Sequence, residues 1–245
     1  MKTLMKYEWV SQRGKFMRNL FLRSSFAAVL VAAIIGFAFR GSVAASEKPA
    51  SLPKPAVDQG QSGMPAQETA VFAGGCFWGI QAVFQHVKGV VSATSGYSGG
   101  SKGTAEYETV STGMTGHAES VQVVFDPSKV TYGELLQVFF SVGHDPTQLN
   151  QQYPDEGTQY RSVVFYANDE QKKIADAYIA QLETAKVYKH KIVTQVVPLK
   201  AFYPAEGYHQ NYAARHPDNP YIAHYDLPKV ANLQQMYPQL YAGSK

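Results

Sequence analysis

From residue 68 to about residue 216 the sequence alternates between two apolar patterns, and this alternation constrains the fold more than any other feature. Some segments carry apolar residues at every second position, as strands do, and others repeat them every three or four positions, as helices do. The strand-like segments are 68–74, 120–126, 162–168 and 191–199, and the helix-like segments are 78–87, 132–143 and 169–182. The order lacks the strict repetition of a barrel, so we expect an α+β fold, a two-layer sandwich with a mixed, largely antiparallel sheet flanked by helices, in a single domain.

Two helix starts have clear sequence markers. Thr131 and Glu134 form a capping box ahead of residues 132–143. Asn168 and Gln171 cap the next helix, in which Ile174, Tyr178 and Leu182 recur every four residues. Residues 144–160 between these helices are polar and have no periodicity, and a loop of this length in a compact domain is usually functional or disordered.

The first 45 residues are predicted to be a signal peptide or a signal anchor. A basic stretch, 1–25, precedes an uninterrupted apolar run of 14 residues, 26–39, which small residues follow. Spanning a bilayer takes about 20 apolar residues, so the shorter run favours a cleaved signal. We therefore expect a periplasmic or secreted protein, with membrane anchoring as the alternative.

The remaining chain divides by composition. Residues 46–67 are rich in Pro, Ser, Gln and Gly and are predicted to form a disordered linker. A folded catalytic domain is expected over 68–225, followed by an irregular C-terminal tail over 226–245. The net charge of the whole chain is +3, and the basic N-terminal stretch, with six Lys and Arg against one acidic residue, accounts for all of this excess. Without that stretch no basic patch indicates a nucleic-acid partner.

Cys76 is the only cysteine in the 245 residues. It lies in GGCFWG, 74–79, where a predicted strand meets a predicted helix. A lone cysteine is more often a buried, inert residue. Export to an oxidising compartment, however, favours paired cysteines, and the first turn of a helix stabilises a thiolate and lowers the thiol pKa. We therefore expect Cys76 to be a reactive nucleophile.

Seven sequence blocks together resemble the A-type peptide methionine sulfoxide reductases. They are GGCFWG (74–79), GYSGG (96–100), YETV (107–110), TGHAESVQVVFDP (115–127), HDPTQ (144–148), DEGTQYRSVVFY (155–166) and AEGYHQNY (205–212). The resemblance covers about residues 68–216 in the order of the family. It implies reduction of the S epimer of methionine sulfoxide, free or in proteins, as repair under oxidative stress.

The resemblance also implies the roles of the site residues. Cys76 would attack the sulfoxide sulfur, Glu119 would protonate the oxygen, and Phe77 with Trp78 would enclose the S-methyl group. Oxygen leaves badly unless it is protonated, and desolvation by the aromatic rings would raise the Glu119 pKa and keep its proton in place. Further polar positions that match the family, where side chains orient the sulfoxide oxygen or a water, are Tyr107, Asp155 and Tyr160.

Oxygen transfer would leave Cys76 as a sulfenic acid. Many relatives resolve it with further cysteines near the C-terminus, which this chain lacks. We therefore expect an external thiol reductant, either a thioredoxin-like or glutaredoxin-like protein or a small thiol. No cofactor or metal is expected, because the sequence has no HExxH or CxxC motif, and we expect a monomer.

Two other functions remain open from the sequence. A single-cysteine thiol peroxidase would also form a sulfenic acid, but it would consume hydrogen peroxide faster than methionine sulfoxide. An exported binding module would contain an inert cysteine, which iodoacetamide would not label at mildly acidic pH.

Overall fold

The computed structural model describes residues 51–60 and 65–243, so the predicted signal segment 1–45 lies outside the described residues. Six strands form one sheet in the order β7-β6-β1-β3-β2-β8. Their bounds are β1 Glu68–Ala73, β2 Val90–Ser98, β3 Ala118–Phe125, β6 Val163–Tyr166, β7 Gln195–Pro198 and β8 Phe202–Pro204. Strands β6 and β7 run parallel and the other neighbours antiparallel. The predicted mixed, largely antiparallel sheet is confirmed.

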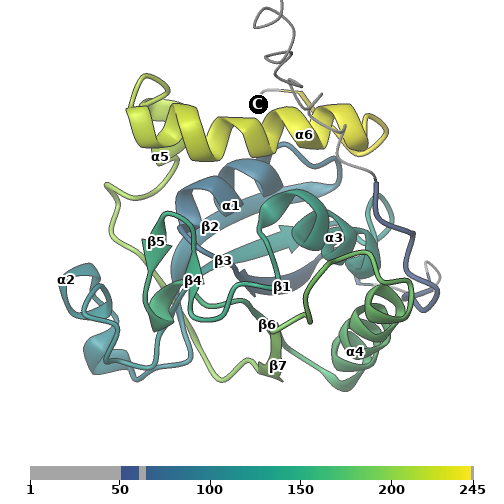
Figure 1. Cartoon of the computed structure of the whole chain (residues 1–245), viewed down its shortest axis with the longest axis horizontal. Helices are drawn as coiled ribbons and strands as arrows, with labels where there is room; N and C mark the ends of the chain where they lie inside the picture. Colours follow the sequence, from purple (N-terminus) through teal and green to yellow (C-terminus); the bar gives the residue numbers. More distant parts are fainter. Residues whose placement is uncertain (1–50, 61–64, 244–245) are drawn as a thin grey trace, which may run out of the picture. The chain divides into compact units, whose positions relative to one another are not determined.

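Helices flank this sheet, as predicted (Figure 1). They are α1 Phe77–Gln85, α2 Tyr107–Val110, α3 Tyr132–Val138, α4 Asp169–Thr184, α5 Tyr212–Arg215 and α6 Leu227–Met236. Short 3-10 helices are η1 Lys102–Thr104 and η3 Thr158–Tyr160, and π-helices are η2 Phe139–Gly143, which continues α3, and η4 Ile222–Asp226, which leads into α6. Helix α1 packs on β2 and β3, and α6 packs on α1. Within the described part of the chain, no helix is both long and apolar enough to cross a membrane.

The helix starts agree with the sequence markers. Both hydrogen bonds of the predicted capping box are present at α3, where the Thr131 hydroxyl accepts the Glu134 N–H and the Glu134 carboxylate accepts the Thr131 N–H. At α4 the Asn168 side chain accepts the Gln171 N–H at 2.9 Å. These bonds satisfy N–H groups that have no partner inside a helix.

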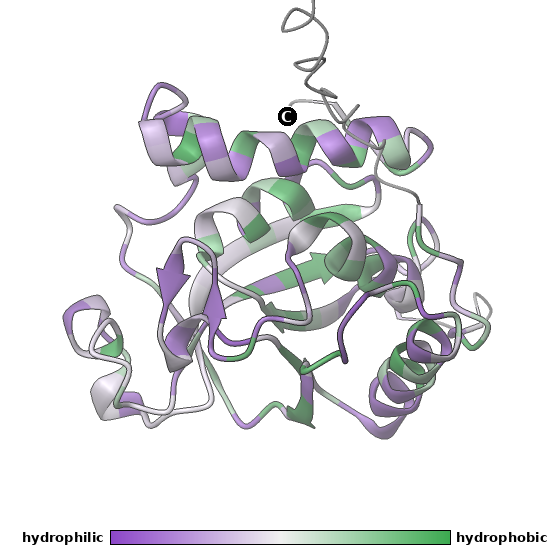
Figure 2. Cartoon of the chain, viewed as in Figure 1, coloured by the Kyte–Doolittle hydropathy of each residue, from purple (hydrophilic) through white to green (hydrophobic). Residues whose placement is uncertain are grey.

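The alternating residues of β1 belong to two apolar clusters. Ala70 and Phe72 belong to the main core with the helices, whereas Val71 and Ala73 belong to a smaller cluster with Phe165 and its neighbours. Figure 2 shows the central strands as hydrophobic and the hairpin of β4 Gln151–Gln152 and β5 Asp155–Glu156 as hydrophilic. This period-2 burial fixes the register of β1, and with it the position of the turn that follows.

The predicted irregular tail over 226–245 is wrong for residues 227–236, which form helix α6. Pro228 stands in the first turn, where proline is well tolerated, and the apolar residues Leu227, Val230 and Leu233 recur at helical spacing. Leu233 is fully buried. The folded domain therefore extends beyond residue 225.

The predicted disordered linker is wrong for residues 51–60. Asp58 accepts the Gly133 N–H at 2.9 Å and the Thr131 hydroxyl at 2.5 Å. The Leu52 N–H donates to the Tyr237 hydroxyl at 2.9 Å. The polar composition of this segment correctly indicates that it has no apolar core of its own. The segment is nevertheless ordered, because residues of the folded domain form hydrogen bonds with its backbone and with the Asp58 carboxylate.

Candidate active site

The turn between β1 and α1 places Cys76. Cys76 is the N-cap residue of α1, as predicted. Gly75 before it has a φ of +92°, and a Cβ there would lie 2.6 Å from Cγ of Gln152. Its N–H donates to the Tyr160 carbonyl at 3.1 Å. A residue with a side chain fits this conformation poorly, so the glycine allows the sharp entry into the helix.

Glu119 reaches the same helix start from β3. Its Oε2 accepts the Phe77 N–H at 3.1 Å, and the residue is 3% exposed. Burial raises the pKa of Glu119 to about 8; the Phe77 N–H opposes this rise, and the charges of Asp155 and Asp226 add to it. The carboxyl therefore keeps its proton at neutral pH, as the sequence predicted.

The expected low pKa of Cys76 is wrong for this structure. Burial raises the pKa of the thiol well above its ordinary value, the nearby carboxylates of Glu119, Asp226 and Asp155 raise it further, and only the Trp78 N–H is among the causes that lower it. The prediction considered the helix start alone, whereas desolvation and three acidic side chains outweigh it. Cys76 is a neutral thiol at rest.

All seven predicted site residues line one cavity of about 220 Å³. The cavity is lined by Cys76, Phe77, Trp78, Tyr107, Glu119, Asp155, Tyr160, Asn219 and Tyr221. Burial is the main cause that raises the pKa of Tyr107 and Tyr160, so both hydroxyls keep their protons. The cavity thus combines a thiol, a neutral carboxyl and two hydroxyl donors with aromatic walls.

Aromatic contacts fix the two predicted walls. The Phe77 ring is buried, with its centroid 5.9 Å from that of Tyr97. The Trp78 ring stacks on Tyr212 at 3.9 Å, and its Nε1 donates to Nδ1 of His209 at 3.2 Å. Segments far apart in the sequence therefore hold the apolar part of the cavity.

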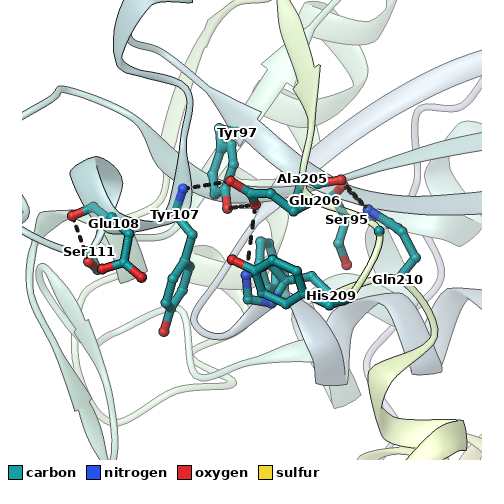
Figure 3. A network of polar contacts seen from close by, with 12 residues as sticks. Ser95, Tyr97, Tyr107, Glu108, Ser111, Ala205, Glu206, His209 and Gln210 are labelled. Atoms are coloured by element: carbon teal, nitrogen blue, oxygen red, sulfur yellow. Dashed lines mark hydrogen bonds and ion pairs between the residues drawn. The ribbon is translucent and has the colours of Figure 1, made fainter.

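Glu206 joins three residues around the cavity through polar contacts (Figure 3). Its carboxylate accepts the Tyr97 hydroxyl and the Tyr107 N–H, both at 2.9 Å, and lies 3.8 Å from Nε2 of His209. One carboxylate therefore links the start of α2, which carries Tyr107, to the histidine that holds Trp78.

The sequence analysis missed Asn219, Tyr221 and Asp226. The first two line the cavity, and the Tyr221 hydroxyl donates to Asp155. Asp226 is fully buried, with its Oδ1 3.2 Å from Nζ of Lys229. All three lie beyond residue 216, where the recognised motifs end, and only the block DNPY in 218–221 could have drawn attention to them.

Comparisons with known proteins agree on one family. A sequence model described as "Peptide methionine sulfoxide reductase" matches residues 68–240. The "Peptide methionine sulfoxide reductase MsrA 2" of Mesorhizobium japonicum is 64% identical over 178 residues, which are 73% of this chain and 91% of the relative. This chain belongs to the peptide methionine sulfoxide reductase family.

Other relatives extend this result. The "Peptide methionine sulfoxide reductase MsrA 2" of Synechocystis sp. is 52% identical over 188 residues, 76% of this chain and 88% of the relative. The crystal structure of reduced Mxr1 from Saccharomyces cerevisiae is similar, with a TM-score of 0.57 and 34% identity over 63% of this chain and 88% of that one. The chain is thus an oxidoreductase for methionine S-sulfoxide, rather than a thiol peroxidase or an inert binding module.

Proposed function

We propose that Cys76 attacks the sulfoxide sulfur directly, while Glu119 donates its proton to the sulfoxide oxygen. The observation that carries this proposal is the convergence of the thiol and a neutral carboxyl on one cavity. A bond forms between the two sulfur atoms. The oxygen, protonated by Glu119, then moves to Cys76; the bond between the oxygen and the substrate sulfur and the bond between the two sulfur atoms both break, and methionine leaves. The thiol proton restores Glu119. The cysteine sulfur loses two electrons and the methionine sulfur gains them.

The hydroxyls of Tyr107 and Tyr160 line the same cavity as Glu119. Because both keep their protons, they are suited to donate hydrogen bonds to the sulfoxide oxygen as negative charge develops on it. Asp155 accepts a hydrogen bond from Tyr221 and is suited to accept another from a water that donates its second proton to the substrate oxygen. The polar side of the cavity therefore stabilises the transition state.

Phe77 and Trp78 form the slot for the S-methyl group. Their rings border Cys76 in the cavity and are fixed by Tyr97, Tyr212 and His209. A slot of fixed shape holds the methyl group, while Cys76 and the hydrogen-bond donors fix the directions of attack and of the oxygen around the pyramidal sulfur, so the remaining substituent can leave the cavity in one direction only. This arrangement accounts for selection of one epimer.

An external thiol is proposed to reduce the Cys76 sulfenic acid. The chain has no second cysteine to form an internal disulfide. A thioredoxin-like protein, a glutaredoxin-like protein or a small thiol could each supply the electrons. The test is turnover with each reductant: multiple turnovers without any added thiol would contradict the proposal.

We also propose that the protein is exported and repairs oxidised proteins outside the cytoplasm. The basic stretch and the apolar run within residues 1–45 support this location. Fractionation of bacterial cells that express the full chain is the test. A shortened chain in the periplasm is expected, and a full-length chain in the cytoplasm would contradict it.

The decisive experiment is the Cys76→Ser variant with dithiothreitol as reductant. We expect reduction of methionine S-sulfoxide to be abolished, while thermal unfolding stays close to that of the unmodified chain because serine is nearly isosteric. The R epimer serves as the substrate control. Undiminished turnover by the serine variant would end the proposal.

A further inference from the structure

Tyr221 belongs to the C-terminal segment, residues 205–226, and connects this segment to the polar side of the cavity. It lines the cavity, and its hydroxyl donates to Oδ2 of Asp155. Within residues 51–60 and 65–243, no other hydrogen bond to the Asp155 side chain is found. Asp155 lies on the two-residue strand β5, where regular pairing gives little support. The position of this carboxylate therefore depends on Tyr221.

The ring of Tyr221 also meets the aromatic side of the cavity. It lies edge-on to Trp78, with centroids 6.2 Å apart and planes at 85°. Its other neighbour is Tyr225, at 5.1 Å. Tyr212 already covers one face of Trp78 at 3.9 Å, so the C-terminal segment contacts the indole both on a face and through an edge.

Charged groups surround the hydrogen bond on several elements. Asp155 interacts electrostatically with Glu119 of β3, Cys76 at the start of α1, Tyr160 of η3, and Asp226 and Lys229 at the start of α6. Burial raises the pKa of Asp155, whereas the bond from Tyr221 and the charge of Lys229 lower it. The hydroxyl thus favours an ionised Asp155, and that charge favours the protonated form of Glu119.

We propose that Tyr221 is a positioning residue of the reductase site, whose hydroxyl holds the Asp155 carboxylate and whose ring holds the Trp78 indole. This role rests on the proposed function of the cavity. In this chain the C-terminal segment thereby completes a site whose reactive groups lie at the start of α1 and on β3.

The test compares Tyr221→Phe and Tyr221→Ala with the unmodified chain on methionine S-sulfoxide and dithiothreitol. The phenylalanine variant keeps the ring and loses the donor. We expect kcat/KM to fall about tenfold, the size of loss for one hydrogen bond to a charged group. Because loss of the Tyr221 hydroxyl raises the pKa of Asp155, the ionised carboxylate is lost at a higher pH, and the acidic decline of the pH profile should move to higher pH. The Tyr221→Ala variant should show the same loss and, in addition, a higher KM, because it also removes the ring that contacts Trp78.

Tyr225→Phe is the matched control, because Tyr225 lies on the same segment and does not line the cavity. It should leave kcat/KM and the pH profile unchanged. If the unmodified chain is active and the Tyr221→Phe variant has the same kcat/KM and pH profile, the role of Tyr221 is overturned and the proposed function stands. An unmodified chain without reductase activity would overturn the proposed function itself.

Discussion

The two walls of the cavity are built in different ways. Cys76 lies in the turn between β1 and α1, Phe77 on α1 and Glu119 on β3. All three are nearly fully buried and are placed by the central strands of the sheet. Asn219 and Tyr221 come from the segment 205–226, in which the four-residue α5 is followed, from residue 220, by a helical stretch that continues through η4 into α6. This second wall is half-buried and is held by single hydrogen bonds and ring contacts.

The two walls therefore have different roles: one carries the reactive groups and the other positions them. Groups that exchange electrons or protons belong to the wall fixed by the sheet, where burial tunes their pKa values. Groups of the C-terminal wall act through the residues they touch. Changes in the first wall should therefore remove catalysis, and changes in the second should reduce it in part.

After Cys76→Ser, the largest expected effect is that of Glu119→Gln. Glutamine can still accept the Phe77 N–H but cannot protonate the sulfoxide oxygen, so we expect kcat to fall about 10²-fold to 10⁴-fold. In the unmodified enzyme the raised pKa of Glu119, about 8, means that the donor is present below pH 8 and is lost above it. Single-turnover rates of the reduced enzyme should accordingly decline above about pH 8, and the glutamine variant should lack this decline. A glutamine variant with normal rates would contradict the claim that the wall fixed by the sheet carries the catalytic groups.

A smaller effect is expected for Glu206→Gln, which tests the polar contacts that the C-terminal segment makes with residues around the cavity. The change weakens the bonds from Tyr97 and Tyr107 and removes the charge that faces His209. We expect kcat/KM to fall about threefold to tenfold, as for the loss of one charge-assisted hydrogen bond. The control is Glu108→Gln on α2, whose exposed carboxylate makes no contact with the cavity. Equal losses in both variants would argue against a specific support.

The smallest effect on activity is expected for Asp58→Ala, which lies outside both walls. The carboxylate binds the start of α3, so its loss should lower the free energy of unfolding by about 1 kcal/mol and leave kcat/KM unchanged. Asp176→Ala is the control; its exposed ion pair with Lys172 should contribute no more than about 0.5 kcal/mol. Denaturant unfolding measures both. A loss of activity in the Asp58 variant would show that the cavity is coupled to residues 51–60.

The sequence predicted the first wall well and the second wall poorly. Local signals sufficed for the turn at Cys76 and for the capping box at Thr131, because the residues that decide them are neighbours in the chain. The roles assigned to Tyr107, Asp155 and Tyr160 required the family resemblance, and the structure brings these residues together in one cavity.

Other features depend on tertiary contacts that no local pattern contains. Tyr221 meets Asp155 across 66 positions of the sequence, so the block DNPY could mark the residue but not its partner. The raised pKa of Cys76 arises from burial and from acidic side chains on three other elements. The ordered residues 51–60 likewise depend on partners in α3 and α4.

Oxygen transfer to Cys76 is tested most directly by a single turnover without any reductant. Reduced enzyme is mixed with excess methionine S-sulfoxide, methionine is quantified, and Cys76 is examined by mass spectrometry after trapping with dimedone. We predict one methionine per chain and a sulfenic acid adduct on Cys76, with neither product formed from the R epimer. Methionine formed while Cys76 stays reduced would contradict the account.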